Sequence, residues 1–136
     1  MQITISHEQD PVPVTVFHLN GDVTSEVELQ DKAKEEFNAG ARNILIDLSE
    51  VPYMSSAGLR ALNYIFRLYR RDTVEESDEA MKIGIAAGTF TSPHLKLLKP
   101  NKNVLEVLKT TGYDMFLEIY QEQKKALASF QSEASE

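Results

Sequence analysis

The chain has 136 residues, no cysteine and a formal net charge of −7, from 14 basic and 21 acidic residues. Its length suits a single domain with its own apolar core, and the lack of cysteine excludes disulfides, cysteine-based zinc sites and a catalytic thiol. The acidic balance disfavours nucleic acid as a partner, because affinity for a phosphate backbone depends on cationic contacts. The apolar runs are far shorter than the ~20 residues of a membrane span and the N-terminus lacks a signal-peptide pattern, so we expect a soluble, cytoplasmic protein that does not bind membranes.

Two strands are predicted at the N-terminus. Ile3 and Ile5 alternate with polar residues, which is typical of a short strand with one wet face, and residues 14–19 predict a second strand. His18 belongs to this second strand. We interpret His18 as structural, because no other histidine or carboxylate stands at ligand spacing in the sequence.

A helix is predicted after the Asn-Gly-Asp turn at residues 20–22. We expect it to begin at Thr24 or Ser25, because acidic residues follow in what would be its first turn, where the helix dipole favours them. Gly40 is the expected C-cap. The spacing of four predicts a buried edge formed by Leu29, Ala33 and Phe37.

The central stretch, residues 43–71, predicts a strand, a short loop and a long amphipathic helix. The apolar run Ile44 to Ile46 is typical of a strand that is covered on both faces. We expect the carboxylate of Asp47 to cap a turn or to accept from a nearby amide rather than to bind metal. The helix follows a serine pair, which suits an N-cap, and its predicted buried stripe consists of Leu59, Leu62, Ile65, Phe66 and Tyr69.

The rest of the chain predicts an acidic segment and then three further elements. Residues 72–93 are rich in acid and contain few apolar residues, with a short helix expected from Ser77 to about Ala87. A strand at residues 94–98, a helix capped by Asn101, a last strand at residues 115–120 and a terminal helix at residues 121–130 follow. We expect residues 131–136 to be a frayed tail. Alternating strands and helices predict an α/β fold with a mixed, largely parallel sheet of about four to five strands and packed helices.

The usual patterns of enzymes are missing from the sequence. The glycines fit neither dinucleotide-binding nor Walker spacing, and the serine pair lacks the Gly-x-Ser-x-Gly elbow. We therefore expect no cofactor, no metal and no catalytic residue. On residue type alone, Ser55 and Ser56 are better read as caps than as regulatory sites.

The string DLSEVPYMSSAGLRAL, residues 47–62, resembles the signature of the STAS domain, the fold of bacterial anti-sigma-factor antagonists. The resemblance extends from about residue 12 to residue 130, and it implies one STAS-like domain at residues 1–130 with an inserted segment at residues 72–93. In the family the loop reads Met-Asp-Ser, then Ser or Thr, then Gly-Leu. Ser56 therefore matches the family's phosphorylated serine, whereas Ser55 replaces the aspartate and Ala57 replaces the following hydroxyl residue.

The resemblance implies a binding protein rather than an enzyme: an antagonist that binds an anti-sigma serine kinase of the histidine-kinase-like ATPase fold when Ser56 is unphosphorylated. A metal-dependent serine phosphatase is the second implied partner. Alternatives are a STAS module of a sensory scaffold, of another partner-switching pathway or of a lipid-transport complex without phosphorylation control, and a serine hydrolase acting through Ser56. Phosphorylation is expected at Ser56, with Ser55 as the weaker candidate. The expected partner contacts are Tyr53, Met54, Ser55, Ser56, Ala57, Gly58 and Arg60.

Overall fold

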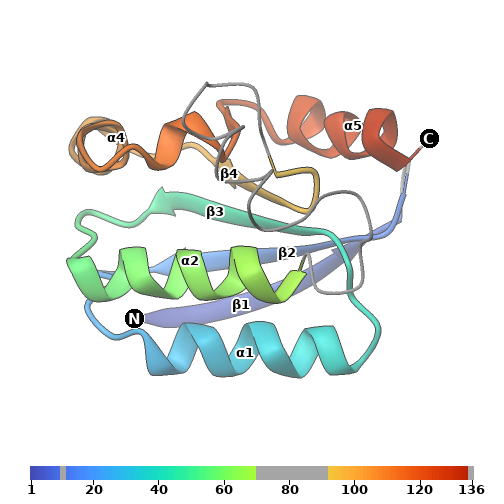
Figure 1. Cartoon of the computed structure of the whole chain (residues 1–136), viewed down its shortest axis with the longest axis horizontal. Coiled ribbons are helices and arrows are strands. Elements are labelled where there is room, and N and C mark those ends of the chain that lie inside the picture. Colours follow the sequence, from blue (N-terminus) through green and yellow to red (C-terminus); the bar gives the residue numbers. More distant parts are fainter. Residues whose placement is uncertain (10–11, 70–91, 135–136) are drawn as a thin grey trace.

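The structure, a computed structural model of the chain, describes residues 1–9, 12–69 and 92–134 (Figure 1). Its sheet has five strands in the order β1-β2-β3-β4-β5, in which β1 is antiparallel to β2 and the other pairs are parallel. The predicted fold class is therefore confirmed. The strands are β1 (Gln2–Glu8), β2 (Val14–Asn20), β3 (Ile44–Glu50), β4 (Leu95–Leu98) and β5 (Ile119–Tyr120), and the helices are α1 (Val27–Asn38), α2 (Ser56–Tyr69), α4 (Lys102–Thr110), the 3-10 helix η1 (Tyr113–Met115) and α5 (Gln123–Ala134).

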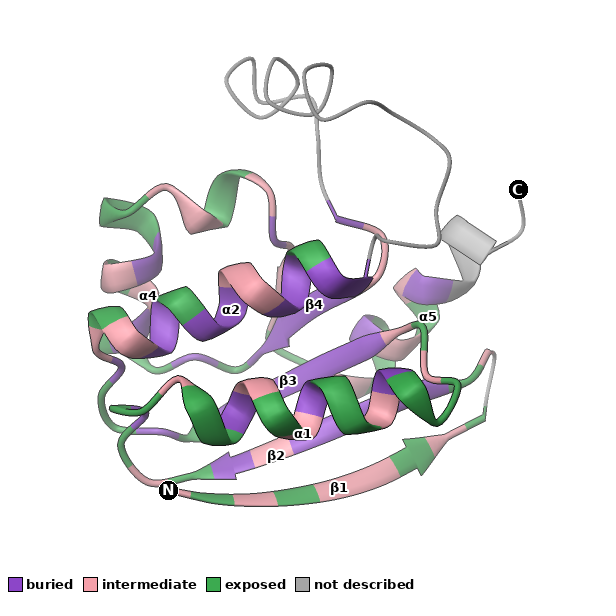
Figure 2. Cartoon of the chain, turned by 60° about the horizontal axis from the view of Figure 1, so that its bottom comes forward, coloured by how far each residue is buried: buried purple, intermediate pink, exposed green. Residues whose placement is uncertain are grey.

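The central strands are buried on both faces, as the apolar run in β3 predicted. Ile44 and Ile46 belong to the larger apolar cluster together with residues of α1 and α2, while Leu45 points to the opposite face and packs with α5. Figure 2 shows this burial along β2 and β3, with the edge strand β1 only partly covered.

The helices divide unequally between the two faces of the sheet. Residues of α1, α2 and α4 pack into the larger cluster on one face, and Ala126 and Phe130 of α5 pack into the smaller cluster on the other. This division follows from chirality: strands that are added in chain order through right-handed crossovers place their connecting helices on the same face. Among the described helices, α5, which follows the last strand, covers the opposite face.

The predicted stripe of α2 is buried, and it is fixed against α1 by a polar contact as well as by packing. The five residues of the stripe are at most 8% exposed. The Tyr69 hydroxyl donates to the Ala33 carbonyl oxygen at 2.8 Å, and the ring of Tyr69 meets that of Phe37 edge-on. Burial raises the pKa of the Tyr69 phenol, so this hydroxyl remains a donor at any physiological pH.

Three sequence-based boundaries were wrong. α1 begins at Val27 with Glu26 as N-cap, because Val23 pairs with Met54 and holds the preceding residues extended. The strand expected at residues 115–120 is reduced to Ile119–Tyr120, because Gly112, with φ +81°, turns the chain into η1. α5 continues to Ala134, beyond the expected end at residue 130. The helix expected between Ser77 and Ala87 lies outside the described residues.

Within the described residues, no helix combines the length and the apolar character needed to cross a membrane. The same part of the chain holds no group of three or more histidine or acidic side chains arranged to bind a metal ion.

Candidate functional site

The loop between β3 and α2, residues 51–55, lies at the carboxyl end of the parallel strands and is joined to the loop between β2 and α1. Val23 and Met54 form an isolated parallel bridge. The Val23 amide donates to the Tyr53 carbonyl oxygen at 2.9 Å, and the Ser55 amide donates to the Val23 carbonyl oxygen at 3.0 Å. Two loops that are distant in sequence therefore form one backbone unit.

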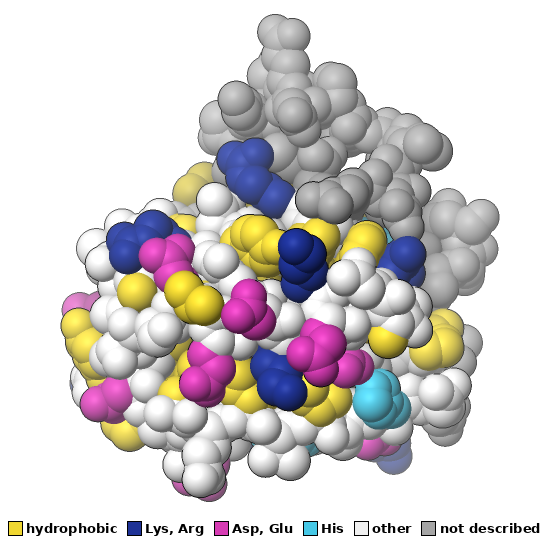
Figure 3. All heavy atoms as spheres, turned by 90° about the horizontal axis from the view of Figure 1, so that it is seen from below, with side chains coloured by type: hydrophobic (Ala, Val, Ile, Leu, Met, Phe, Trp, Pro, Cys, Tyr) yellow, Lys and Arg dark blue, Asp and Glu magenta, His cyan; other side chains and the backbone are white. Residues whose placement is uncertain are grey.

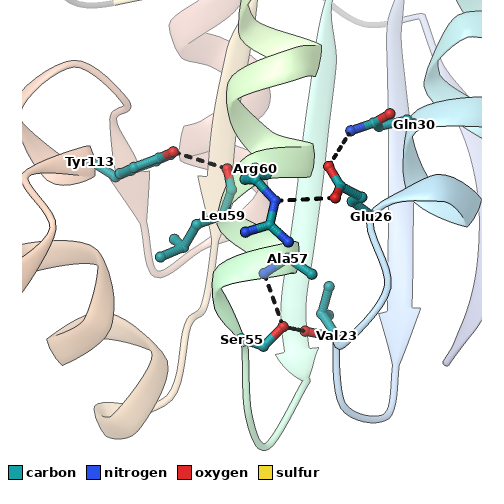
Figure 4. Close-up of polar contacts among 8 residues, drawn as sticks. All are labelled: Val23, Glu26, Gln30, Ser55, Ala57, Leu59, Arg60 and Tyr113. Carbon is teal, nitrogen blue, oxygen red and sulfur yellow. Dashed lines mark hydrogen bonds and ion pairs between the residues drawn. The ribbon is translucent and has the colours of Figure 1, made fainter.

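Ser55 is the N-cap of α2. Its Oγ accepts from the Ala57 amide at 3.1 Å, and the same hydroxyl donates to the Val23 carbonyl oxygen at 3.2 Å (Figure 4). Its carbonyl oxygen accepts the first helical hydrogen bond, from the Leu59 amide at 3.1 Å. Ser55 therefore satisfies one of the amides that a helix start leaves unpaired, and its hydroxyl is already engaged in both directions.

Ser56 is the first residue of α2, and it is exposed. Its hydroxyl makes no hydrogen bond within the part of the chain that the structure describes, in contrast to the hydroxyl of Ser55. The cap prediction thus applies to Ser55, and Ser56 is the serine that the fold presents to solvent.

Gly58 and Met54 are buried beneath this surface. Met54 is 2% exposed, and a Cβ placed on Gly58 would lie 2.7 Å from Met54 Cγ and 2.9 Å from Val23 Cγ1. The absence of a side chain at Gly58 is what lets α2 start directly against the joined loops. The expected contacts at Met54 and Gly58 are therefore positioning residues in this structure, whereas Tyr53, at 51% exposure, is open to a partner.

Arg60 extends over the first turn of α2 and pairs with the N-cap residue of α1. Its Nε lies 3.1 Å from Glu26 Oε1, and Gln30 Nε2 donates to the other oxygen of Glu26 at 3.1 Å (Figure 4). Sequence analysis selected Arg60 but missed Glu26, because the two are separated by 34 residues in the chain. The pair joins the starts of the two helices at the surface.

Two further anchors hold the loop and were also missed. Asn101, the N-cap of α4, donates from Nδ2 to the carbonyl oxygens of Val51 and Pro52 at 3.2 and 3.3 Å. The Tyr113 hydroxyl donates to the Leu59 carbonyl oxygen at 3.0 Å (Figure 4). The predicted cap at Asn101 was the only available signal for these contacts, which depend on the packing of α4 and η1 beside α2.

The surface seen from below is electrostatically mixed. Figure 3 shows acidic side chains interspersed with basic ones and with apolar side chains on this face. Among the described residues, the most exposed large apolar side chains include Val27, at 60%, in the first turn of α1, and Tyr53. Tyr53 lies in the loop between β3 and α2, and Val27 directly follows the loop between β2 and α1. Binding residues commonly collect on such loops of a rigid scaffold.

A second polar group crosses β1, β2 and β3 on the face that carries the smaller cluster. His18 Nδ1 lies 2.9 Å from Asp47 Oδ2, and its Nε2 lies 3.2 Å from Ser6 Oγ. Sequence spacing could not reveal this carboxylate, because His18 and Asp47 are brought together by the parallel register of β2 and β3. Asp47 also accepts from the Ser49 amide at 3.0 Å, as predicted. Burial raises the pKa of Asp47, but hydrogen bonds from Ser49 and His18 outweigh it and hold the pKa below its usual value.

This group has the serine-histidine-aspartate order of a hydrolase triad. Ser6, however, lies inside β1 opposite Val16, and not in a loop or at a helix start where amides are available to an oxyanion. We therefore interpret the group as structural, consistent with the sequence-based interpretation of His18.

The mostly parallel five-stranded sheet, with helices packed on both of its faces, is an α/β fold. The STAS domain family matches residues 5–75, just over half of the chain, and the protein belongs to this family. The matched residues include β3, the loop and the whole of α2. A comparison with curated proteins found no match.

Solved structures of the same fold cover nearly the whole chain. A putative anti-sigma factor antagonist from Thermotoga maritima has a TM-score of 0.67 at 20% identity, covering 95% of this chain and 94% of its own. An anti-sigma factor antagonist from Mycobacterium paratuberculosis has a TM-score of 0.67 at 17% identity, covering 96% and 95%. The Bacillus cell fate determinant SpoIIAA in its phosphorylated form has a TM-score of 0.55 at 17% identity, covering 90% and 96%. At these identities the similarity shows the fold.

Proposed function

We propose that this protein is an anti-sigma-factor antagonist in a partner-switching pathway. Unphosphorylated, it binds an anti-sigma serine kinase of the histidine-kinase-like ATPase fold through the joined loops and the start of α2. Phosphorylated on Ser56, it is released. The observation that carries the proposal is the contrast within the serine pair. The Ser55 hydroxyl caps α2, whereas Ser56 is exposed and its hydroxyl makes no hydrogen bond among the described residues.

The chain acts as ligand and substrate, and the chemistry belongs to its partners. In the modification, a bond forms between Ser56 Oγ and the γ-phosphorus of ATP on the kinase, the bond from that phosphorus to ADP breaks, and the hydroxyl proton is lost. A metal-dependent serine phosphatase reverses the state by hydrolysis to serine and inorganic phosphate. The ATP and the metal ions are held by these partners.

The position of Ser56 explains how modification acts without unfolding. A phosphate adds about 1.5 to 2 negative charges, and at the start of α2 it meets the positive end of the helix dipole, worth typically ~0.3 to 1 kcal/mol at an exposed site. The fold should therefore retain its stability. In the complex, the same dianion would be desolvated against a surface that fits a neutral hydroxyl, and an unpaired buried charge costs far more than the dipole returns.

Three facts support the proposal. The family match includes the loop and Ser56, relatives of the same fold are described as anti-sigma factor antagonists, and one relative is known in a phosphorylated form. The exposed side chains around Ser56 include an aromatic residue, Tyr53, of a type that is enriched in protein interfaces.

The proposal is tested by affinity capture from the native cell with the full chain, using wild type, Ser56→Ala, Ser56→Asp and the matched control Ser55→Ala. We expect wild type and Ser56→Ala to retain a kinase of the ATPase fold, Ser56→Asp to lose it with an unchanged melting curve, and phosphosite mapping to find phosphate on Ser56 and not on Ser55. Equal capture by Ser56→Ala and Ser56→Asp would contradict the switch and favour a STAS module without phosphorylation control.

A further inference from the structure

The ion pair between Arg60 and Glu26 uses only part of the donor capacity of the guanidinium. Within the described residues the guanidinium makes one contact, from Nε to Glu26 Oε1 at 3.1 Å, while Glu26 also accepts from Gln30. The Arg60 side chain is 59% exposed and that of Glu26 is 34% exposed. Such an exposed pair contributes little, typically ~0.2 to 1 kcal/mol, so a stronger anion within reach can replace the carboxylate.

Ser56 and Arg60 are four residues apart on α2 and are both exposed. Residues at this spacing are neighbours on a helix surface, with Cβ atoms ~5 to 6 Å apart. Helical side chains also lean toward the N-terminus of the helix, so the side chain of Arg60 covers the turn that begins with Ser56. Figure 4 shows the guanidinium of Arg60 over the first turn of α2, with its terminal nitrogens pointing toward Ala57.

We propose that Arg60 is the internal receptor for the phosphate of modified Ser56, and that it leaves Glu26 to bind it. The inference rests on the proposed phosphorylation of Ser56 and names the residue that responds to it. Arginine presents paired N–H donors that match two phosphate oxygens, and such charge-assisted contacts are stronger than one contact to a carboxylate. The phosphate carries about 1.5 to 2 charges against one for Glu26.

The exchange changes the surface at two places. Before modification, Glu26 is neutralised by Arg60. After modification, the Glu26 carboxylate retains only Gln30 and stands unpaired beside Val27, the exposed apolar residue in the first turn of α1. A partner that covers both loops thus meets a new charge at Ser56 and an uncompensated carboxylate at Glu26, although only one residue has been modified.

The test places phosphoserine at position 56 during synthesis of the full chain, so that no kinase is needed, and follows the phosphate by phosphorus NMR as a function of pH. A cation beside the phosphate favours its dianion, so the midpoint of its second ionisation falls. We expect Arg60→Gln to raise the midpoint by about 0.2 to 0.7 pH unit relative to the wild-type sequence. Glu26→Gln should lower it, because it removes the competing carboxylate, and Arg60→Lys should retain part of the shift.

Arg67, an exposed arginine further along the same helix, provides the matched control, and Arg67→Gln should leave the midpoint unchanged. Equal midpoints for the wild-type and Arg60→Gln proteins, or an equal rise for Arg67→Gln, would overturn the proposal. Melting curves of the phosphorylated variants verify that each is folded. Because no partner takes part in this titration, its failure is distinguishable from failure of the capture experiment, which tests the kinase interaction itself.

Discussion

Replacing Gly58 with alanine should destabilise the protein, although this substitution usually stabilises a helix. The new methyl group would lie 2.7 Å from Met54 Cγ, 2.9 Å from Val23 Cγ1 and 3.1 Å from the Val23 carbonyl oxygen. Neither carbon is the free end of a flexible chain, and Val23 is fixed by its bridge to Met54. The helix start and the joined loops must therefore move apart.

The magnitude follows from two opposing effects. Overpacking a close contact by one methyl group costs typically ~1 to 3 kcal/mol, and glycine to alanine in a helix gains at most ~1 kcal/mol. We expect a net loss of about 1 kcal/mol in the free energy of unfolding. For a domain of this size the melting temperature should fall by roughly 3 °C.

Thermal and urea unfolding of Gly58→Ala, Val23→Ala and the double variant measure the effect and its cause. Val23→Ala removes one of the two clashing carbons, so Gly58→Ala should cost less in that background, with a coupling of about 0.5 kcal/mol or more. Ser56→Ala, an exposed change two residues away, controls for general effects at the helix start. An increase in stability for Gly58→Ala, or strict additivity with Val23→Ala, would refute the close-contact argument.

Four other substitutions test three separate contacts. Ser55→Ala removes the cap of α2 and should cost about 1 kcal/mol in urea unfolding; a cost equal to that of Ser56→Ala would be inconsistent with the cap. Lys96 is fully buried, and its Nζ lies 2.8 Å from Glu118 Oε1. Glu118→Ala leaves this buried charge unpaired and should cost about 2 kcal/mol or more in the free energy of unfolding, whereas Lys96→Met removes the charge itself and should cost less. The reverse order in thermal unfolding would disprove this. Hydrogen bonds from Ser49 and His18 hold the pKa of Asp47 below its usual value, so this carboxylate contributes stability above its unfolded-state pKa and loses it as the pH falls through the folded-state pKa. Asp47→Asn should therefore lose stability at pH 7 and show a flatter decline below about pH 4, and an unchanged acid decline would argue against a role for this carboxylate.

The elements that could be predicted from sequence are those whose signal is local. The buried faces of β3 and of α2 can be predicted from the spacing of apolar residues within each segment alone, as in the run at residues 44–46 and the stripe of α2. The N-cap at Asn101 is likewise local, as is the helix end at Gly40, although the C-cap itself is Ala39 and Gly40 is the left-handed residue that follows it. The last strand was predicted too long, because residues 113–115 form the 3-10 helix η1 and Leu117 is buried without pairing to β4.

The candidate site was predictable in its residues but not in its organisation. Ser56 and Arg60 were selected by sequence, yet the difference between the two serines depends on Val23, which is 32 residues from Ser55. The partner of Arg60 is determined by the packing of α1 against α2, and the contact of His18 with Asp47 by the strand register. Such long-range contacts leave no periodicity in the sequence.

The arrangement of the sheet has a consequence for how the protein is made. Each strand lies beside the strand that precedes it in the sequence. The strands β1, β2 and β3 can therefore pair with one another before synthesis of the chain is complete. The opposite face of these strands packs against Phe130 of α5, the last described helix, which is synthesised much later. The strand residues on that face include Val14, Val16 and Leu45. At roughly 5 to 20 residues per second, this interval lasts several seconds. A nascent chain that stalls before Gln123 lacks the residues of α5 that pack on this face, and its apolar surface is then available to chaperones and to other unfinished chains.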